Sequence, residues 1–151
     1  MILQLTVQRL TKAVEYLSKI KAHPFRESGK IVIGADTVVA IDGKILGKPK
    51  NEKDAFLMLK NLSGKEHSVF TGVTVIKNDK EVTFSVQTKV KFFELDDREI
   101  EDYISSGEPF DKAGAYGIQG KGSLFVEKID GDYFNVVGLP ISRLARQLKS
   151  I

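Results

Sequence analysis

A run of apolar residues from Ile31 to Ala40, many of them β-branched, contains one carboxylate, Asp36, and beside it one hydroxyl, Thr37. Such a run is typical of a buried β-strand. A polar group buried there without a partner costs several kcal/mol, so Asp36 needs a partner or a function. It is expected late in the strand, where α/β sheets collect ligands. Either Asp36 binds a divalent cation or orients a water molecule, or it caps a neighbouring loop. Thr37 either donates to a ligand or only fills the strand.

Helical and strand patterns alternate along the rest of the chain. The first helix is expected over residues 6–22, with an apolar face formed by Leu10, Ala13, Val14, Leu17 and Ile20. Asp42-Gly43 and Asn78-Asp79 are typical of hairpin turns. We therefore expect an α/β or α+β fold, and of these the α/β class, with helices flanking a mixed β-sheet. Further helices are predicted from Asn51 to Ser63, from Asp96 to Gly107 and from Pro140 onward, and further strands over 45–46, 69–76, 81–93 and 123–129.

The size and composition indicate one domain that spans residues 1–151. Of the 151 residues, 42% are hydrophobic, which is enough for a core. No apolar run reaches the roughly 20 residues of a membrane helix, and the first residues lack the pattern of a secretory signal. The absence of cysteine excludes disulfides and thiolate metal sites. A cytoplasmic protein without a membrane partner is therefore expected.

The charge of the chain is mildly basic. The net charge of +3 comes from 23 basic and 20 acidic residues that are spread along the sequence. This balance suits a small anionic ligand such as a nucleotide. A nucleic-acid-binding module is an alternative, but no basic motif interleaved with aromatic residues supports it. We therefore expect no specific nucleic acid as a partner.

A second polar segment, DKAGAYGIQG from Asp111 to Gly120, has little core-forming pattern. Its glycines let backbone amides approach a ligand closely. Gln119 can both donate to and accept from the edge of a nucleobase, and Lys112 can neutralise a phosphate. The alternative is a tight turn that carries an Asp–Lys surface pair.

Two further lysines are candidates of different weight. Lys48 lies in Gly47-Lys48-Pro49, a short loop that proline stiffens, and a lysine held in this way suits a phosphate. Lys21, near the end of the first predicted helix, is by its spacing only a surface lysine. His23 and His67 are not spaced as metal ligands.

These segments resemble the Maf family of nucleoside triphosphate pyrophosphatases. The resemblance implies an elongated α/β fold around a mixed sheet, with a cleft between two lobes. The matching blocks are IVIGADTVV (31–39), GKP (47–49), LSG (62–64), DKAGAYGIQG (111–120) and KIDGDYFNVVGLPIS (128–142), with Lys21-Ala22 upstream.

The resemblance also implies hydrolysis between the α- and β-phosphates of a nucleoside triphosphate, with Mg²⁺ or Mn²⁺. Asp36 matches the family's acidic residue, which activates water or holds the metal. Lys21 and Lys48 match lysines that face the triphosphate, and Thr37 and Gln119 match positions associated with base choice. The GIQG form resembles the branch that acts on dTTP and UTP, including modified pyrimidines. Family members are often dimeric, so a homodimer is a further expectation.

The resemblance does not extend to the N-terminal segment. Family members begin with a strand and a phosphate-binding loop of the pattern Ser-x-Ser-Pro-Arg-Arg, which residues 1–14 do not match. An N-terminally shortened member of the family is therefore expected. Because arginines on a polyphosphate are hard to replace, two hypotheses follow. The chain is either an active pyrophosphatase that prefers pyrimidines or a nucleotide-binding remnant without turnover.

Overall fold

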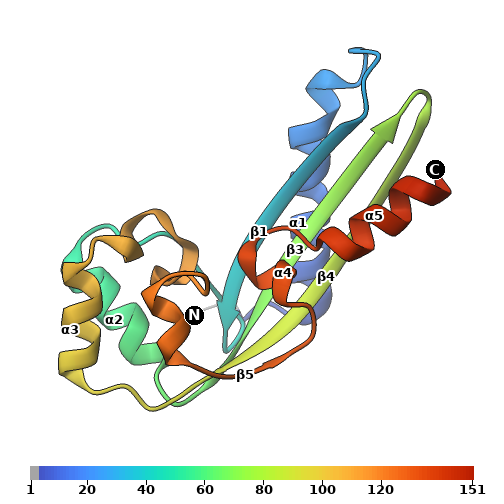
Figure 1. Cartoon of the computed structure of the whole chain (residues 1–151). Coiled ribbons are helices and arrows are strands. Elements are labelled where there is room, and N and C mark those ends of the chain that lie inside the picture. The colour runs from blue at the N-terminus through green and yellow to red at the C-terminus, as the bar shows by residue number, and fades with distance from the viewer. Residues whose placement is uncertain (1–3) are drawn as a thin grey trace.

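The computed structural model describes residues 4–151, which form a five-stranded sheet with the order β2-β1-β3-β4-β5 (Figure 1). The strands are β1 (Val32–Ile41), β2 (Lys44–Leu46), β3 (Glu66–Lys77), β4 (Lys80–Phe92) and β5 (Val126–Asp130). The helices are α1 (Val7–Ala22), α2 (Glu52–Leu62), α3 (Asp97–Ser105), α4 (Tyr133–Val137) and α5 (Ile141–Ser150). Short 3₁₀ helices are η1 (His23–Phe25), η2 (Glu108–Asp111), η3 (Ala113–Ala115) and η4 (Lys121–Phe125).

The α/β class is confirmed, but the described strands pair antiparallel throughout, where the sequence predicts a mixed sheet. Tight turns account for two of the four antiparallel pairings. β1 joins β2, and β3 joins β4, through two residues each, and a connection of that length can only reverse the chain. Asp42 (φ 51°), Gly43 (φ 73°) and Asn78 (φ 58°) adopt the left-handed backbone that such turns require. The two hairpins predicted from the sequence are therefore correct.

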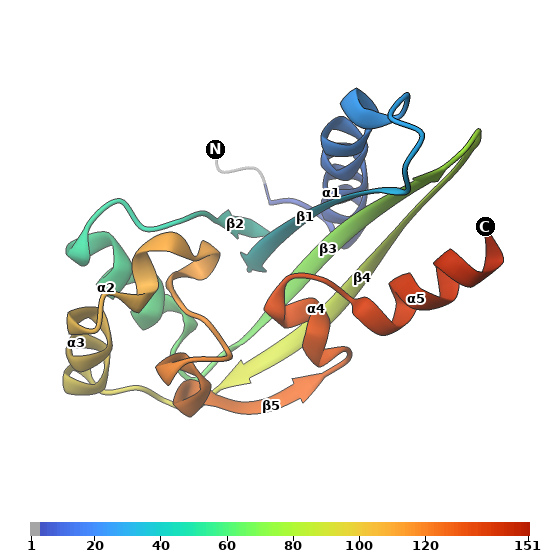
Figure 2. The same ribbon diagram turned by 45° about the horizontal axis from the view of Figure 1, so that its top comes forward.

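The helices are divided between the two faces and one end of the sheet. α1 lies on one face, and α4 and α5 lie on the other (Figures 1 and 2). α2 and α3 gather with the short 3₁₀ helices beyond one end of the long strands. The molecule thus has an elongated lobe built on the sheet and a smaller helical lobe, as the family resemblance implies.

The largest core cluster joins the helical lobe to the sheet. Leu59 of α2, Ile100 of α3 and Phe92 of β4 are fully buried within it. The ring of Tyr116 meets the edges of Phe92 and His67, with centroids 4.8 and 5.4 Å apart. Edge-to-face pairs of this kind add about 0.5–1.5 kcal/mol each to the burial of the rings. The chain around Tyr116 is therefore anchored to the end of the sheet.

The face of helix α1 that contacts the sheet matches the predicted one only in part, because Leu10 and Val14 are buried as predicted. Leu17 and Ile20 are 38% and 48% exposed, so their prediction as core residues is wrong. The buried positions instead recur every four residues, at Leu10, Val14, Ser18 and Ala22. Serine and alanine occupy the C-terminal half of this stripe because the helix backbone there lies directly against the sheet.

Two glycines of the sheet allow this close approach. A Cβ atom at Gly34 would collide with the carbonyl oxygen of Ser18, and one at Gly72 would collide with the backbone of Val14. Gly72 on β3 is the pairing partner of Asp36 on β1. The glycines thus bring the helix backbone against the sheet beside Asp36.

We expect Gly72→Ala to destabilise the fold by about 1–3 kcal/mol, because the added methyl group must push α1 off the sheet. Urea unfolding measures this loss. Gly47→Ala is the matched control, since a Cβ at Gly47 meets nothing within 4 Å and the backbone is not left-handed. Equal stability of Gly72→Ala and wild type would contradict the packing described.

Candidate active site

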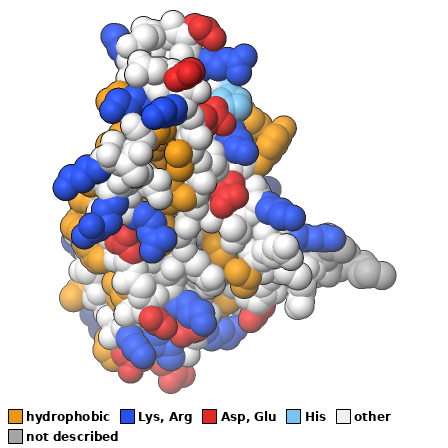
Figure 3. All heavy atoms as spheres, turned by 90° about the vertical axis from the view of Figure 1, so that its right-hand side faces the viewer, with side chains coloured by type: hydrophobic (Ala, Val, Ile, Leu, Met, Phe, Trp, Pro, Cys, Tyr) orange, Lys and Arg blue, Asp and Glu red, His pale blue; other side chains and the backbone are white. Residues whose placement is uncertain are grey.

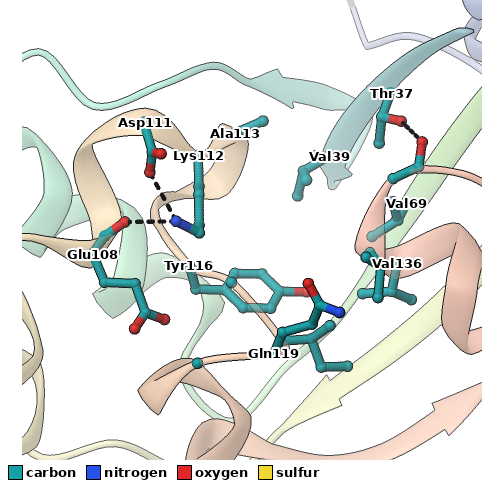
Figure 4. Close-up of a pocket in the computed structure, with 15 residues that line it drawn as sticks. Thr37, Val39, Val69, Glu108, Asp111, Lys112, Ala113, Tyr116, Gln119 and Val136 are labelled. Carbon is teal, nitrogen blue, oxygen red and sulfur yellow. Dashed lines mark hydrogen bonds and ion pairs between the residues drawn. The ribbon is translucent and has the colours of Figure 1, made fainter.

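A cavity of about 520 Å³ lies between the sheet and the segment from Glu108 to Gly120 (Figure 4). One wall is apolar and is formed by Val39 of β1, Val69 of β3 and Val136 of α4. The opposite wall carries the polar side chains of the Glu108–Gly120 segment. A hollow of this volume, with few polar groups against an apolar wall, is typical of a small-molecule site.

Three of the residues selected from the sequence, Thr37, Lys112 and Gln119, line this cavity. Thr37 comes from β1, whereas Lys112 and Gln119 come from the glycine-rich segment that the anchored Tyr116 holds against the sheet. The amide of Gln119 is exposed and points into the cavity (Figure 4). The structure therefore brings together the two polar segments that stand out in the sequence.

The hydroxyl of Thr37 has partners within the protein. It donates to the carbonyl oxygen of Gly138 at 3.2 Å, and the Thr71 hydroxyl lies 2.8 Å away. Because a hydroxyl has one proton, Thr37 then accepts from Thr71. Thr37 thus fastens the end of α4 to β1, and one lone pair of its oxygen stays open to a ligand.

Lys112 is held at the cavity wall by its neighbours. Its ammonium group donates to the Asp111 carboxylate at 2.8 Å and to the Glu108 carbonyl oxygen at 3.2 Å (Figure 4). The hydrogen bond and the charge of Lys112 lower the pKa of Asp111, and the charge of Lys48 adds to this effect. The sequence allows either an Asp–Lys pair or a ligand-binding loop in this segment. The structure has both features, because the Asp111–Lys112 pair is part of the loop that lines the cavity.

Lys48 lies near this wall without lining the cavity. The amide of Gly114 donates to the carbonyl oxygen of Gly47 at 3.1 Å, which fastens the Gly47-Lys48-Pro49 loop to the glycine-rich segment. Pro49 is buried, whereas Lys48 is exposed. The ammonium group of Lys48 therefore belongs to a stiff loop beside the cavity, as its prediction as a phosphate ligand requires.

Asp36 and Lys21 lie together on the other face of β1. Lys21 donates to the Asp36 carboxylate at 2.6 Å and to the Ala35 carbonyl oxygen at 2.9 Å. Successive side chains of a strand point to opposite faces, so Thr37 faces the cavity and Asp36 faces α1. The candidate residues thus form two groups, one on each face of the strand.

Both groups adjoin the same edge of β1. β2 pairs only with residues 39–41, and β3 occupies the opposite edge of β1. Within the described part of the chain, residues 32–38 therefore have no strand on their outer edge. A ligand that passes over this edge can contact both Thr37 and Asp36. Asp36 lies in the middle of β1 rather than late in it, because the strand continues to Ile41.

Asp36 offers a single carboxylate to a cation. Among residues 4–151, no group of three His, Cys, Asp or Glu side chains could hold a metal ion. Lys21 binds one oxygen of Asp36, Oδ1, and the Asp36 side chain is 18% exposed. Mg²⁺ commonly takes one or two protein carboxylates together with phosphate oxygens and water. Asp36 therefore fits a cation that arrives with a phosphate ligand.

The sequence patterns do not indicate a role in this region for either His67 or Glu108. His67 is 2% exposed, and its Nε2 lies 2.6 Å from the hydroxyl of Tyr116, which lines the cavity. Burial lowers the pKa of His67 to about 4 and raises the pKa of Tyr116, so both are neutral near pH 7. Glu108 lines the cavity and binds backbone amides of the Gln119 loop. Neither residue has a motif or spacing that predicts these contacts.

The distribution of surface charge gives little support to the alternative of a nucleic-acid-binding module. On the face shown in Figure 3, basic side chains are interspersed with acidic and apolar ones rather than gathered into one patch. No helix among residues 4–151 is long and apolar enough to cross a membrane.

Comparison with known proteins agrees with the resemblance seen in the motifs. The family model described as Maf-like protein matches residues 4–151. The chain belongs to the Maf family. The matched region includes all the candidate residues of this Maf protein, on both faces of β1.

Relatives of this Maf protein that are named dTTP/UTP pyrophosphatase are similar over most of its length. The relative from Bacillus pumilus is 57% identical over 139 residues, which are 91% of this chain and 74% of the relative. The relative from Carboxydothermus hydrogenoformans is 56% identical over 149 residues, 97% of this chain and 76% of the relative. A relative from Bacillus cereus is 59% identical over 133 residues, 88% of this chain and 70% of the relative.

The buried His67 makes the stability of the protein sensitive to acid. Its folded-state pKa of about 4 lies below the ordinary 6.5, so between these values the unfolded chain binds a proton that the folded protein does not. Stability should fall by about 3 kcal/mol as the pH drops through this window. Urea unfolding near pH 7 and near pH 4 measures this fall in the free energy of unfolding. The fall should be smaller in His67→Gln than in wild type, because the variant lacks the buried imidazole.

His23→Gln is the matched control for this measurement, because His23 lies near the surface beside Glu81. It should keep the wild-type fall in stability. The same fall in His67→Gln as in wild type would contradict the assignment of a neutral, buried His67.

Proposed function

We propose that this Maf protein is a nucleoside triphosphate pyrophosphatase that acts on dTTP and UTP, including modified pyrimidines, and yields the monophosphate and pyrophosphate. The names of its relatives support this substrate choice. The observation that carries the proposal is the presence, at the same edge of β1, of a cavity large enough to hold a nucleobase and of a lysine–carboxylate pair.

The cavity suits a pyrimidine base. The Gln119 amide can donate and accept at once, which matches the carbonyl and imide N–H groups on the edge of thymine or uracil. Val39, Val69 and Val136 offer an apolar surface to the face of the ring or to a 5-methyl group. We assign the base to this cavity, with Gln119 as the group that reads its edge and Thr37 beside it.

The phosphates would leave the cavity over the outer edge of β1. Lys48 and Lys112 lie on the cavity side of this edge, and Lys21 lies on the α1 side. Because each lysine carries a positive charge on a flexible stem, the three can follow a triphosphate from one face to the other. On this path the phosphates reach Asp36.

Asp36 would hold Mg²⁺ or Mn²⁺ together with phosphate oxygens. When bound, the cation neutralises phosphate charge and acidifies a water molecule. Water attacks the α-phosphorus, and the bond from that phosphorus to the bridging oxygen of the β-phosphate breaks. Pyrophosphate leaves with the bridging oxygen and the electron pair. Asp36 orients the attacking water and accepts its proton, and the lysines stabilise the charge on the leaving group.

We expect Asp36→Asn to lower pyrophosphate release from dTTP and UTP about a hundredfold or more, because the amide neither carries the charge nor accepts a proton. The fold should remain, since the substitution keeps the shape of the side chain. The assay measures pyrophosphate with Mg²⁺ or Mn²⁺ and after chelation, beside the melting temperature of each variant.

Asp79→Asn, in the β3–β4 turn, is the matched control and should turn over like wild type. Pyrophosphate release at the wild-type rate in Asp36→Asn would contradict the role assigned to Asp36. Well-folded wild-type protein that binds dTTP without releasing pyrophosphate would contradict the proposed function itself.

We expect Gln119→Ala to raise the KM for dTTP and UTP about tenfold, because the base loses hydrogen bonds worth about 1–3 kcal/mol while the phosphate contacts stay. The turnover number at saturating substrate should change less. Gln147→Ala, on α5 away from the cavity lining, is the control. An unchanged KM in Gln119→Ala would contradict the assignment of the base to this cavity.

A further inference from the structure

The loop that carries Gln119 is held at its beginning by a tyrosine. The amide of Gly117 donates to the hydroxyl oxygen of Tyr103 at 3.1 Å. That hydroxyl in turn donates to Oε1 of Glu108 at 2.8 Å. Tyr103 is buried on α3, so the start of the loop is tied to a rigid helix through a side chain that Glu108 orients.

Glu108 also holds the end of the same loop. Its Oε2 accepts from the amide of Lys121 at 3.1 Å, and its Oε1 accepts from the amide of Gly122 at 3.3 Å. One loop amide before Gln119, that of Gly117, is thus connected through Tyr103 to the Glu108 carboxylate, and two amides after Gln119 bind this carboxylate directly. Charge-assisted hydrogen bonds of this kind are stronger than neutral ones.

The glycine at the turn leaves no gap between the loop and this carboxylate. A Cβ atom at Gly120 would overlap the carboxylate of Glu108. Gly120 has a negative φ of −99°, so what opposes a side chain here is the Glu108 carboxylate, and an added methyl group would displace either this carboxylate or the loop. The residue next to Gln119 therefore lies in direct contact with Glu108.

The charge state of Glu108 is consistent with this arrangement. Burial on its own raises the pKa of Glu108, but the hydrogen bonds from Tyr103 and from the amides of Lys121 and Gly122, with the charge of Lys112, outweigh burial and lower the pKa. Glu108 is therefore ionised near neutral pH, and each of its oxygens can accept from the loop.

We propose that Glu108 is a positioning residue that sets the base preference of the site by fixing the loop of residues 117–122, and with it the amide of Gln119. The proposal rests on the proposed function of the cavity. In this role Glu108 acts through Tyr103 and the loop amides rather than on the reacting phosphate groups. Its loss should impair the choice and binding of the base more than the chemical step.

Glu108→Gln tests this role with almost no change of volume. A glutamine has one acceptor oxygen, and its NH₂ group must face either the Lys121 amide or the Gly122 amide and Tyr103 hydroxyl, all of which are donors. The loop should therefore shift. Gly120→Ala should displace it from the other side, because the added methyl group meets the Glu108 carboxylate. Glu101→Gln, on the exposed surface of α3, is the matched control.

Steady-state pyrophosphate release from dTTP and CTP provides the first measurement. In Glu108→Gln and Gly120→Ala, the KM for dTTP should rise about tenfold or more and the preference for dTTP over CTP should shrink, since small displacements of positioning groups are costly. A merely structural role would reduce the active fraction, and hence the apparent kcat, without moving KM or the preference. Unchanged KM and preference would overturn the proposal.

Amide hydrogen exchange by NMR provides the second measurement, and it does not depend on turnover. The amides of Lys121 and Gly122 should exchange faster in Glu108→Gln than in Glu101→Gln and wild type. Equal exchange would overturn the positioning role. If wild type releases no pyrophosphate while exchange accelerates as expected, the proposed function fails and the loop restraint stands as a structural feature.

Discussion

The alternation of side chains along β1 determines how this site is built. Asp36 and Thr37 are neighbours in sequence, yet they face opposite sides of the sheet because the period of a strand is two residues. Each face then receives its own partners. α1 brings Lys21 to Asp36 on one side, and α4 with the glycine-rich segment closes the cavity over Thr37 on the other. The outer edge of β1 is where the two sides meet.

The cavity wall owes its shape to buried contacts rather than to the polar residues it displays. The rings of Tyr116, Phe92 and His67 meet edge to face at the end of the sheet, which anchors one end of the wall. The Glu108 carboxylate ties down the other end through backbone amides. Between these anchors Gln119 extends into the cavity. A polar side chain held in this way loses little conformational freedom when a ligand binds.

Local signals predicted much of the fold. The predicted helix starts at Asn51 and Asp96, both of which are N-caps in the structure, and both hairpin turns are confirmed. Helical spacing predicted only the N-terminal half of the buried face of α1, because the glycines that determine how the C-terminal half contacts the sheet lie on other elements. Motifs likewise selected Thr37, Lys112 and Gln119, which line one cavity. No motif could predict the placement of Lys21 and Asp36 on the opposite face, or the links from Glu108 to the loop, because these depend on strand facing and on contacts between segments.

The separation of the two faces has a functional consequence. In the proposed function, the groups that read the base lie on the cavity side of β1, whereas the carboxylate that serves the phosphates lies on the side of α1. The loop from Gly117 to Gly122 can therefore change without altering the contact between α1 and the sheet. Conversely, the glycines under α1 fix the Lys21–Asp36 pair without touching the cavity. A fold of this kind can alter its base preference through one restrained loop while its charged pair stays in place.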